Sequence, residues 1–564
     1  MNTTEEAIPF RLYPHCSRIP LVSNTFSLTI RSSSGRSLPT TLALSVMHLD
    51  TLVVEETLVL EEGSSSYTHE VSLEGISIPS GDTGMGFGIE VSSDTHTAST
   101  AIDIGDGLLR YGFVSDFKTA DLLRVDRVVE HMVRNHITHV QFYDWAYRPH
   151  QFGPPVISAH YEDTMGKPID FTVVKALIEG FRTHHIKSLG YGAVYAATNE
   201  YLDEHPEEAL YDIEGNTFDL IDKFFIMDLD DQGWRENIIK QYTYAVDTVG
   251  FDGLHMDTYG YPKTGWGYDQ EHSHSLEASF VSFIDEWGSH GHENIFNNVG
   301  GWPARSTASA DQAACYIEVW EPHRKYHQLR TMIGEVLPFR KPVILAAYLE
   351  PFKIRDEKND LFHSGPIRAA KLLTAVVSSL GATSLLLGED GVVLTQPYYS
   401  DYTRLTEAEA EILRKYYDFQ VRYRELLFDP SLVDITESHA LGENREFTIA
   451  AGEYPVSHDG EAGTSWGVVR RAKTRIVMHL INLLGQSDDR WNETKSPCST
   501  RPPITLRIPR FSHDMRIYTA SPEESCGKAS LLSCRNVEGV RGPSISVELE
   551  QVGLCVNVNQ FFHR

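Results

Sequence analysis

The sequence predicts a multidomain α/β and β protein, in which a central (β/α)8 barrel of the TIM type lies between two antiparallel β-sandwiches. The chain has 564 residues and is 41% hydrophobic, so it is long enough for several domains and too apolar for a disordered chain. Short alternating strands separated by Ser and Gly clusters occupy both ends, whereas short apolar strands alternate with helices in the middle.

The two ends of the chain have the pattern of β-sandwiches. Residues 1–107 contain alternating runs such as 25–33 and 41–49, and clusters of Ser and Gly separate these runs. Strands of this length and spacing predict an immunoglobulin-like sandwich, and we find no motif in it that indicates chemistry. Residues 428–564 return to the same pattern and are expected to form a Greek-key β-sandwich.

Residues 108–427 have the rhythm of repeated strand–helix units. Eight strands are expected, at 111–117, 140–145, 188–196, 253–257, 294–300, 316–320, 343–350 and 383–390. This number favours a TIM-type barrel. A doubly wound open sheet is the alternative, but no G-x-G-x-x-G motif follows the first strand. The long stretch at 197–233 is expected to be an inserted loop over the site.

Two helical segments of this region are predicted in more detail. Segment 120–136 is amphipathic, and one face of it carries Leu122, Val125, Val129, Met132 and Val133. After the eighth strand, Thr406 and Glu409 have the spacing of a capping box, which marks the start of a helix.

The charge of the chain excludes two classes of partner. There are 49 Lys and Arg against 78 Asp and Glu, a formal net charge of −29, which argues against binding to nucleic acid or to an anionic membrane surface. No apolar run of 18 residues occurs, so no transmembrane helix is expected. Aromatic residues make up 10% of the chain and suggest an uncharged ligand that stacks on rings.

The N-terminus and the cysteines favour a cytoplasmic protein with reduced thiols. Residues 1–20 carry an acidic pair and no apolar core, so no signal peptide is expected; the protein would be secreted if a signal peptide has been removed. None of the six cysteines forms a C-x-x-C pair, which argues against a zinc or redox motif, although Cys526 and Cys534 could pair.

No metal or cofactor is expected. The pair His184 and His185 and the group Glu271, His272 and His274 lack the spacing of zinc-protease ligands, so surface histidines are the favoured interpretation. Segment 228–231 has three aspartates but lacks the Gly and the distal Glu of an EF-hand loop.

Carboxylates at the carboxyl ends of the barrel strands are the candidate reacting groups, because barrel enzymes place their chemistry there. The predicted strand ends carry Asp116, Asp144, Asp257, Glu318, Glu350 and Glu389. In 253–257, alternation puts Asp257 on one face with His255 and puts Leu254 and Met256 on the face that meets the helices. In 316–320, Glu318 shares its face with Tyr316 and Trp320.

Two inward carboxylates on nearby strands are what glycoside hydrolysis requires. Trp320 and Tyr316 give Glu318 a half-apolar environment that raises a carboxyl pKa, so Glu318 suits the general acid. Asp257, which is shorter and lies near His255, suits the anionic nucleophile. The alternative is that these carboxylates only tie strand ends to loops by salt bridges.

Residue types that bind sugars collect at the same strand ends. Sugar rings present an apolar face and a belt of hydroxyls, so their sites combine aromatic planes with polar side chains. Residues of these types at the strand ends are Tyr143, Asp144, Trp145, Tyr191, Tyr195, Asn297, Asn298, Trp302, Glu389, Tyr398 and Tyr399. Any single Tyr is as well explained by packing, but together they favour a carbohydrate cleft.

The order of these motifs resembles glycoside hydrolase family 66, which contains dextranases and cycloisomaltooligosaccharide glucanotransferases. RYGFVSDF, QFYDWAYRPH, GYGAVYAA and IMDLDDQGW follow one another as in that family. GFDGLHMDTYG at 250–260 is similar to its nucleophile strand and YIEVWEP at 316–322 to its acid/base strand. The resemblance continues through LLLGED and PYYS at 385–400 to HLINLLGQSDDRW at 479–491.

The resemblance implies an α-1,6-linked glucan substrate, a sandwich–barrel–sandwich layout and a retaining mechanism. It implies that Asp257 is the nucleophile and Glu318 the general acid/base, as the strand ends also suggest. Tyr143, Asp144 and Tyr195 match a sugar subsite, and His255 lies where a polar contact is expected. The candidate substrate contacts are Tyr143, Asp144, Trp145, Tyr195, His255, Asn298, Trp302, Trp320, Glu389 and Tyr399.

Three functions are weighed. The leading hypothesis is an endo-acting, retaining α-1,6-glucanase that cleaves dextran or isomalto-oligosaccharides, and the second is a transglycosylase that forms or opens cyclic isomalto-oligosaccharides. Only 63 positions separate Trp320 from Thr383, which leaves no room for the binding module that the glucanotransferases insert late in the barrel. The third hypothesis is a non-catalytic sugar-binding protein, in which one carboxylate would be expected to be lost. A cytoplasmic enzyme would act on imported oligosaccharides.

Overall fold

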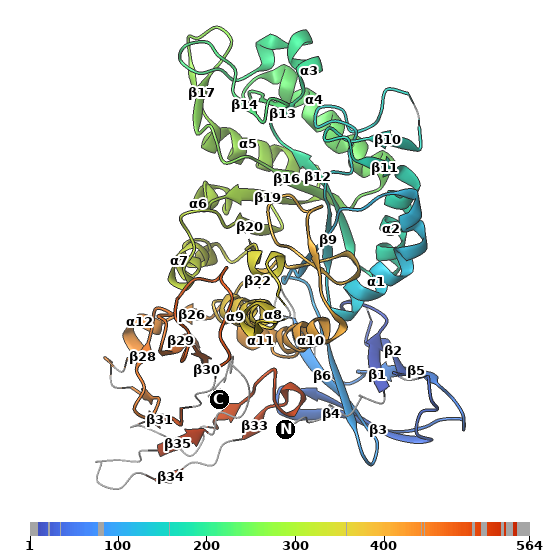
Figure 1. Ribbon diagram of the computed structural model, residues 1–564, viewed down its shortest axis with the longest axis vertical. Coiled ribbons are helices and arrows are strands. Elements are labelled where there is room, and N and C mark those ends of the chain that lie inside the picture. The colour runs from blue at the N-terminus through green and yellow to red at the C-terminus, as the bar shows by residue number, and fades with distance from the viewer. Residues whose placement is uncertain are drawn as a thin grey trace.

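The first and last segments of the chain lie at the same end of the molecule, below the central strands and helices (Figure 1). The computed structural model describes residues 10–20, 23–33, 35–76, 84–156, 158–356, 358–441, 443–444, 446–498, 502–508, 516–531, 535–536 and 545–549. Cys534 lies outside the described residues, and so does its possible pairing with Cys526.

Two antiparallel sheets form the N-terminal part. One contains β1 (Phe10–Pro14), β2 (Thr25–Ser32) and β5 (Ser66–Ser72), and the other contains β4 (Thr51–Val59), β3 (Thr41–His48), β6 (Met85–Ser92) and β7 (Thr97–Ile104). Alternate residues of both sheets, such as Phe26 and Ile89, point into one shared hydrophobic core. β3 alternates between buried and less buried residues as the sequence pattern predicted, whereas β6 is buried on both faces because α10 (Glu407–Arg422) packs on its outer side.

The centre of the molecule is an eleven-stranded curled sheet that forms a barrel-like domain. Its parallel strands are β8 (Tyr111–Val114), β9 (His139–Phe142), β12 (Lys187–Ala193), β16 (Gly253–Asp257), β19 (Glu293–Val299), β20 (Ala314–Glu318), β21 (Val343–Ala346), β22 (Thr383–Ser384) and β23 (Leu387–Gly388). β22 pairs with β21, and β23 pairs with the first strand β8, so the sheet curls round on itself. Two short antiparallel strands, β24 (Val392–Val393) and β25 (Thr403–Arg404), follow.

Every strand predicted for this region overlaps an observed strand, and the strand at 253–257 agrees at both ends. The predicted facing is confirmed as well: Leu254 and Met256 belong to the core between strands and helices, whereas Tyr316 belongs to the core inside the curled sheet. Gly253 permits the close pairing of β16 with β19, because a β-carbon there would lie 1.8 Å from the Glu293 carbonyl oxygen.

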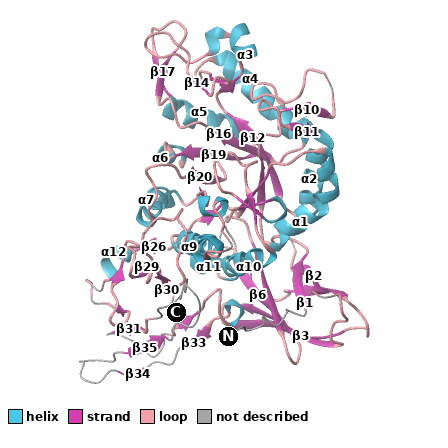
Figure 2. Cartoon of the chain, in the orientation of Figure 1, coloured by secondary structure: helices cyan, strands magenta, loops and turns pink. Residues whose placement is uncertain are grey.

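Helices surround the curled sheet (Figure 2). The longer ones are α1 (Val125–Arg134), α2 (Phe171–Thr183), α4 (Gln232–Thr243), α5 (Leu276–Gly288), α7 (Tyr326–Val336), α9 (Gly365–Ser379) and α10 (Glu407–Arg422). The capping box of Thr406 and Glu409 is confirmed at the start of α10. Leu122, which we expected on the apolar face of one long helix, is exposed, because residues 119–124 form a 3₁₀ helix and the α-helix begins only at Val125.

Two inserted segments lie beyond the carboxyl ends of the central strands. The predicted loop at 197–233 carries β13 (Ala196–Ala197), β15 (Phe224–Ile226) and β14 (Asp219–Leu220), which form a small sheet. A hairpin of β10 (His160–Glu162) and β11 (Pro168–Asp170) lies between β9 and α2. Both insertions contribute to the wall of the candidate site described below.

The C-terminal part is again rich in antiparallel strands. The longest are β29 (Ser465–Ala472) and β30 (Arg475–Asn482), and β31 (Ile504–Ile508) pairs with β35 (Ile545–Leu549). Val469, Met478 and Leu506 share a hydrophobic core of their own. In the part of the chain that the structure describes, no helix has both the length and the apolar character required to cross a bilayer.

Candidate active site

A cavity of about 420 Å³ opens at the carboxyl ends of the central strands. Side chains at or just beyond the ends of β9, β12, β16, β19 and β20 line it, together with residues 397–399. Leu220 and Phe224 from the first insertion and Asp163 and Met165 from the hairpin complete the wall. The long segment at 197–233 therefore reaches the site, as predicted from the sequence.

Asp257 and Glu318 face each other across one amide group. The Nδ2 atom of Asn297 donates a hydrogen bond of 2.6 Å to Oδ1 of Asp257 and one of 2.8 Å to Oε2 of Glu318. These two carboxylate oxygens therefore lie at most about 5.4 Å apart. Asn297 is itself buried on β19, between the strands that carry the two carboxylates, so its position is fixed by the sheet.

Glu318 is only 8% exposed, and its environment favours the protonated form. Burial, followed by the negative charge of Asp257, raises the pKa of Glu318 to about 7. The hydroxyl of Tyr348 donates a hydrogen bond to Oε1, and this bond and that of Asn297 oppose the rise. A carboxyl group with such a pKa holds its proton at weakly acidic pH and releases it near neutrality.

Burial also raises the pKa of Asp257, which shares the Asn297 amide with Glu318 but takes its second side-chain hydrogen bond from Tyr191. Tyr191 donates a hydrogen bond of 2.6 Å to Oδ2, and Asn297 bonds the other oxygen. Burial raises the pKa of Asp257, while these hydrogen bonds and that of the Thr258 backbone N–H lower it. The two carboxyl groups therefore have different environments, which is the condition under which one can be an acid while its neighbour is an anion.

His255 lies beneath the pair as a neutral ring. Burial lowers its pKa to about 3, and its Nδ1 atom is 3.0 Å from the hydroxyl of Tyr111. The ring stacks on Tyr111 and Tyr191 and meets Tyr316 edge-on. His255 lines the cavity, and its ring is neutral at ordinary pH; its predicted contact with a sugar stays a prediction.

Aromatic rings form much of the remaining wall. Tyr143 and Tyr399 are stacked with ring centroids 4.4 Å apart, and both line the cavity. Trp320 lies at the rim with 42% of its surface exposed, and it meets Tyr348 edge-on. Asp144 also lines the cavity; burial and the nearby charge of Asp163 raise its pKa to about 7. The wall thus combines aromatic faces with hydrogen-bonding groups.

Comparison with known families matches residues 23–551 to glycosyl hydrolase family 66. The chain belongs to this family. It is therefore an enzyme of the glycoside hydrolase type, and the third hypothesis, a non-catalytic binding protein, is excluded. The resemblance noted from the motifs is confirmed over nearly the whole chain.

Relatives of this family 66 enzyme include two proteins from Niallia circulans, both named cycloisomaltooligosaccharide glucanotransferase. They are 22% and 20% identical over 93% and 90% of this chain, which correspond to 68% and 67% of the relatives. The solved structure of a Paenibacillus sp. enzyme of that name, complexed with cycloisomaltoheptaose, superposes with a TM-score of 0.85 at 19% identity. It covers 98% of this chain and 99% of the solved one. The two structures share their fold.

Five predicted contact residues of the family 66 enzyme lie behind the cavity wall or outside it. Trp145 and Tyr195 are fully buried and offer no surface to a sugar: the Trp145 indole N–H donates to the carbonyl of Tyr191, and Tyr195 bonds the loop after β16. The others are Asn298, Trp302 and Glu389. In this structure Trp145 and Tyr195 support the residues around the cavity, and their predicted contact with a sugar stays a prediction.

The other three have identifiable structural partners. Asn298 ties β19 to β20, because its Nδ2 atom donates a 2.7 Å hydrogen bond to the carbonyl of Tyr316. Trp302 packs against Phe280 on the helix side. Glu389 is buried and accepts hydrogen bonds from the backbone and side chain of Ser115. None of the three is among the described residues that line the cavity.

The sequence-based prediction missed Tyr348 as a site residue. We named Glu350 as the carboxylate at this strand end, but Glu350 is exposed and begins a short 3₁₀ helix, Glu350–Lys353, beyond it. Tyr348 lies on the same face as Ile344 and Ala346, so alternation along the strand was the signal that could have found it. Tyr191 and Asn297 were recognised as suitable residue types but were not chosen as contacts.

The fold brings together a group of possible metal ligands that we did not expect from the sequence. Asp228, Asp230 and His274, which we assigned to separate motifs, come together with their donor atoms within 4.8 Å of one another. The Nδ1 atom of His274 lies 2.5 Å from Oδ2 of Asp228, and the backbone N–H of Asp230 bonds Oδ1. All three residues lie outside the set that lines the cavity.

Proposed function

We propose that this family 66 enzyme is a retaining, endo-acting glycoside hydrolase of α-1,6-linked glucans, with Asp257 as nucleophile and Glu318 as general acid/base. The observation that carries the proposal is the shared amide of Asn297. Retaining glycosidases have carboxyl groups about 5–5.5 Å apart, whereas inverting enzymes need about 6.5–9.5 Å to admit a water molecule. The facing oxygens, Oδ1 of Asp257 and Oε2 of Glu318, lie at most about 5.4 Å apart, and this close approach supports retention.

In the first step, Glu318 protonates the oxygen of the glycosidic bond while Asp257 attacks the anomeric carbon. The bond to the leaving sugar breaks, and a covalent ester forms between Asp257 and the glycosyl unit. The Tyr191 hydrogen bond holds the other carboxylate oxygen of Asp257 in place. The raised pKa of Glu318 supplies the proton at weakly acidic pH.

In the second step, Glu318 is an anion and takes a proton from the incoming water. The water oxygen attacks the anomeric carbon and displaces Asp257, so two inversions give net retention. The charge of Asp257 is one cause of the raised pKa of Glu318. Because the ester removes that charge, the pKa of Glu318 falls in the intermediate, which suits its change from acid to base.

The substrate proposal rests on the relatives and on the cavity wall. The family relatives are named for isomalto-oligosaccharides, and a solved relative was complexed with cycloisomaltoheptaose. Stacked tyrosines and an exposed Trp320 at the rim suit an uncharged sugar chain. Tyr143, Asp144, His255, Trp320 and Tyr399 are the predicted contacts that we retain in this proposal.

A second candidate function is transfer to a sugar instead of water, which forms or opens cyclic isomalto-oligosaccharides. The named relatives favour this candidate, because both are glucanotransferases. The chemistry of the first step is the same for both functions. Only the acceptor in the second step differs, and an exposed aromatic side chain at the rim, such as Trp320, suits an acceptor sugar.

We also propose the domain layout predicted from the sequence. The N-terminal sandwich comprises residues 1–107, the (β/α)8 barrel residues 108–427 and the C-terminal sandwich residues 428–564. The separate cores of the first and last parts and the curled parallel sheet between them support this division. Immunoglobulin-like and Greek-key topologies remain our assignments for the two sandwiches.

Incubation with four substrates tests the proposal. Dextran, linear isomalto-oligosaccharides, cycloisomaltoheptaose and the α-1,4-glucan amylose are each incubated with the enzyme, and the products are separated by length and ring size. Early release of oligosaccharides from dextran supports endo-hydrolysis, whereas rings or elongated products from linear chains support the second candidate. Activity on amylose alone would refute the assigned linkage.

A further inference from the structure

A second cavity lies at the opposite end of the central strands from the candidate active site. Its volume is about 760 Å³. The first residues of four strands line it: His139 of β9, Lys187 of β12, Glu293 of β19 and Val343 of β21. Segments before β8 and after α10 close it, so residues far apart in the sequence meet there.

The lining is basic in a chain that is strongly acidic. It contains five Lys and Arg, namely Arg18, Lys187, Arg340, Lys341 and Arg470, against the three acids Asp106, Glu293 and Asp429. All three acids are engaged: Glu293 pairs with Lys187 and His139, Asp429 pairs with Arg475, and Asp106 lies 4.0 Å from Arg18. A local excess of positive charge in a protein of net charge −29 attracts anions to this cavity.

Three of the cations form no ion pair within 4.0 Å among the described residues, although the charges of Asp311 and Asp285 act on Lys341 and those of Asp434 and Asp429 act on Arg470. Among the described residues, no carboxylate oxygen lies within 4.0 Å of a side-chain nitrogen of Arg340, Lys341 or Arg470. Lys341 donates to the carbonyl of Ala310 only, and Arg470 donates to backbone carbonyls of residues 427 and 432. Arg470 is 2% exposed and its Nε atom has no hydrogen-bond partner, and burial lowers its pKa to about 10.

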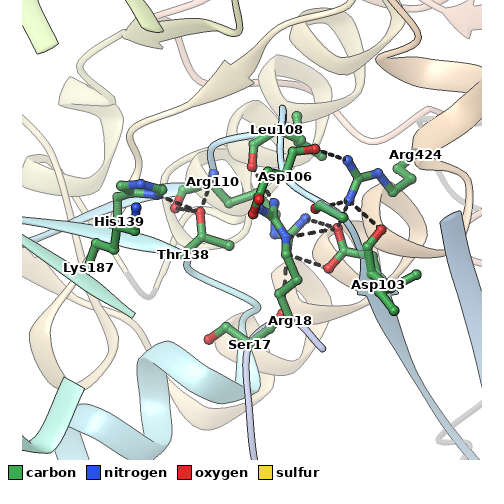
Figure 3. Close-up of polar contacts among 12 residues, drawn as sticks. Ser17, Arg18, Asp103, Asp106, Leu108, Arg110, Thr138, His139, Lys187 and Arg424 are labelled. Carbon is green, nitrogen blue, oxygen red and sulfur yellow. Dashed lines mark hydrogen bonds and ion pairs between the residues drawn. The ribbon is translucent and has the colours of Figure 1, made fainter. Parts of the chain in front are cut away.

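A cluster of arginines adds to the charge at the edge of the cavity (Figure 3). Arg18, Arg110 and Arg424 surround a single buried carboxylate, that of Asp103, at distances of 3.6, 2.8 and 2.7 Å. Arg18 lines the cavity, and its Nε atom has no hydrogen-bond partner. Burial and repulsion from Arg110 and Arg424 lower the pKa of Arg18 to about 9, so it remains charged at neutral pH.

We propose that this cavity is a binding site for a small phosphate ester. Arg and Lys are the side chains that bind phosphate oxygens, and Arg340, which is exposed and lines the cavity, is suited to this contact. The volume falls in the range of small-molecule sites and exceeds what inorganic phosphate would fill. Ile19, Leu108 and Leu337 also line the cavity and would contact the organic part of the ester.

Calorimetric titration of the full chain tests the site. Glucose 6-phosphate, inorganic phosphate and glucose are titrated separately at constant ionic strength. We expect binding of glucose 6-phosphate, weaker binding of inorganic phosphate and no binding of glucose. The doubly substituted variant Arg340→Gln with Lys341→Gln should bind the ester at least tenfold more weakly, while its activity on dextran stays unchanged.

A matched control separates this site from general charge effects. Lys175 also donates to backbone carbonyls at the protein surface but lies outside both cavities, so Lys175→Gln should bind the ester like the parent chain. The proposal would be overturned if no phosphate bound, if the double variant kept full affinity, or if the ester competed with the glucan for the active site.

Discussion

Asp257 and Glu318 share one hydrogen-bond donor, the side-chain amide of Asn297. This arrangement limits the distance between Oδ1 of Asp257 and Oε2 of Glu318, because both oxygens accept from the same nitrogen atom. It also links their pKa values, since the amide stabilises the charged form of each. The proposed mechanism depends on this pair, and the first predictions address it.

Removal of either carboxylate should abolish most of the activity. For Glu318→Gln we expect a loss of roughly 10²–10⁴-fold in kcat, the usual contribution of general acid catalysis. For Asp257→Asn we expect a loss of at least about 10³-fold, because no ester can form. Full residual activity of either variant on dextran would refute the assignment.

Azide distinguishes the two roles. With Asp257→Ala and an activated α-glycoside, azide should attack the anomeric carbon directly and give the inverted glycosyl azide. With Glu318→Ala, azide should intercept the glycosyl-enzyme and give the retained product. The anomeric configuration of each product, measured by NMR, shows whether the two assignments are correct or must be exchanged.

The pH profile should report both carboxyl groups. Glu318 must be protonated in the first step, and its pKa is raised to about 7, so kcat/KM should fall as the pH rises through about 7. Tyr348→Phe removes a hydrogen bond that lowers this pKa, so this alkaline limb should move to higher pH. An unchanged limb in Tyr348→Phe would show that another group controls it.

Asn297→Ala should shift the whole profile. Loss of the shared donor raises the pKa of both carboxyl groups, so the acidic and the alkaline limbs should both move to higher pH. We also expect kcat to fall by roughly tenfold or more, because the pair loses its common support. Asn216→Ala, in an exposed turn and not among the residues that line the cavity, is the control and should leave the profile unchanged.

Asp103 is expected to be critical for stability. Three arginines lie around its buried carboxylate and hold its pKa well below its usual range. The stabilisation is therefore present above the unfolded value of about 4 and is lost as the pH falls below it. Asp103→Asn should cost roughly 3–5 kcal/mol, the usual cost of breaking a buried ion pair. Asp106→Asn should change the melting temperature little, because that side chain is 78% exposed and 4.0 Å from Arg18.

Local patterns were sufficient to predict the strands that carry Asp257 and Glu318. The two-residue period of a strand is set by the backbone alone, so the opposite facing of Asp257 and Met256 could be deduced from the sequence. The same two-residue period also placed Glu318, at the end of β20, on the face that lines the cavity. The family resemblance was confirmed because its motifs extend over most of the chain.

Other parts of the site depended on where each strand ends. We extended the second strand to Trp145, but β9 ends at Phe142 and Asp144 has a φ of 51°, in the left-handed region. This turn breaks the alternation and sends Trp145 into the core beside Phe251. Tyr348, just beyond β21, was missed for the related reason that we placed the strand end at Glu350.

The basic cavity could not be predicted from any local pattern. Arg18, Lys341 and Arg470 belong to three distant segments, and only the packed chain brings them to one cavity. The net charge of −29 gave no indication of a local excess of positive charge. The net charge is a property of the whole chain, whereas the binding of a ligand depends on the few charges that line its site.

The anomeric configuration of the first product tests the central claim most directly. A linear isomalto-oligosaccharide is hydrolysed in an NMR tube, and the anomeric protons are recorded before mutarotation. The mechanism with Asp257 as nucleophile predicts that the α-anomer forms first and that the β-anomer appears later by mutarotation. Initial formation of the β-anomer would mean inversion and would contradict the proposed roles of Asp257 and Glu318.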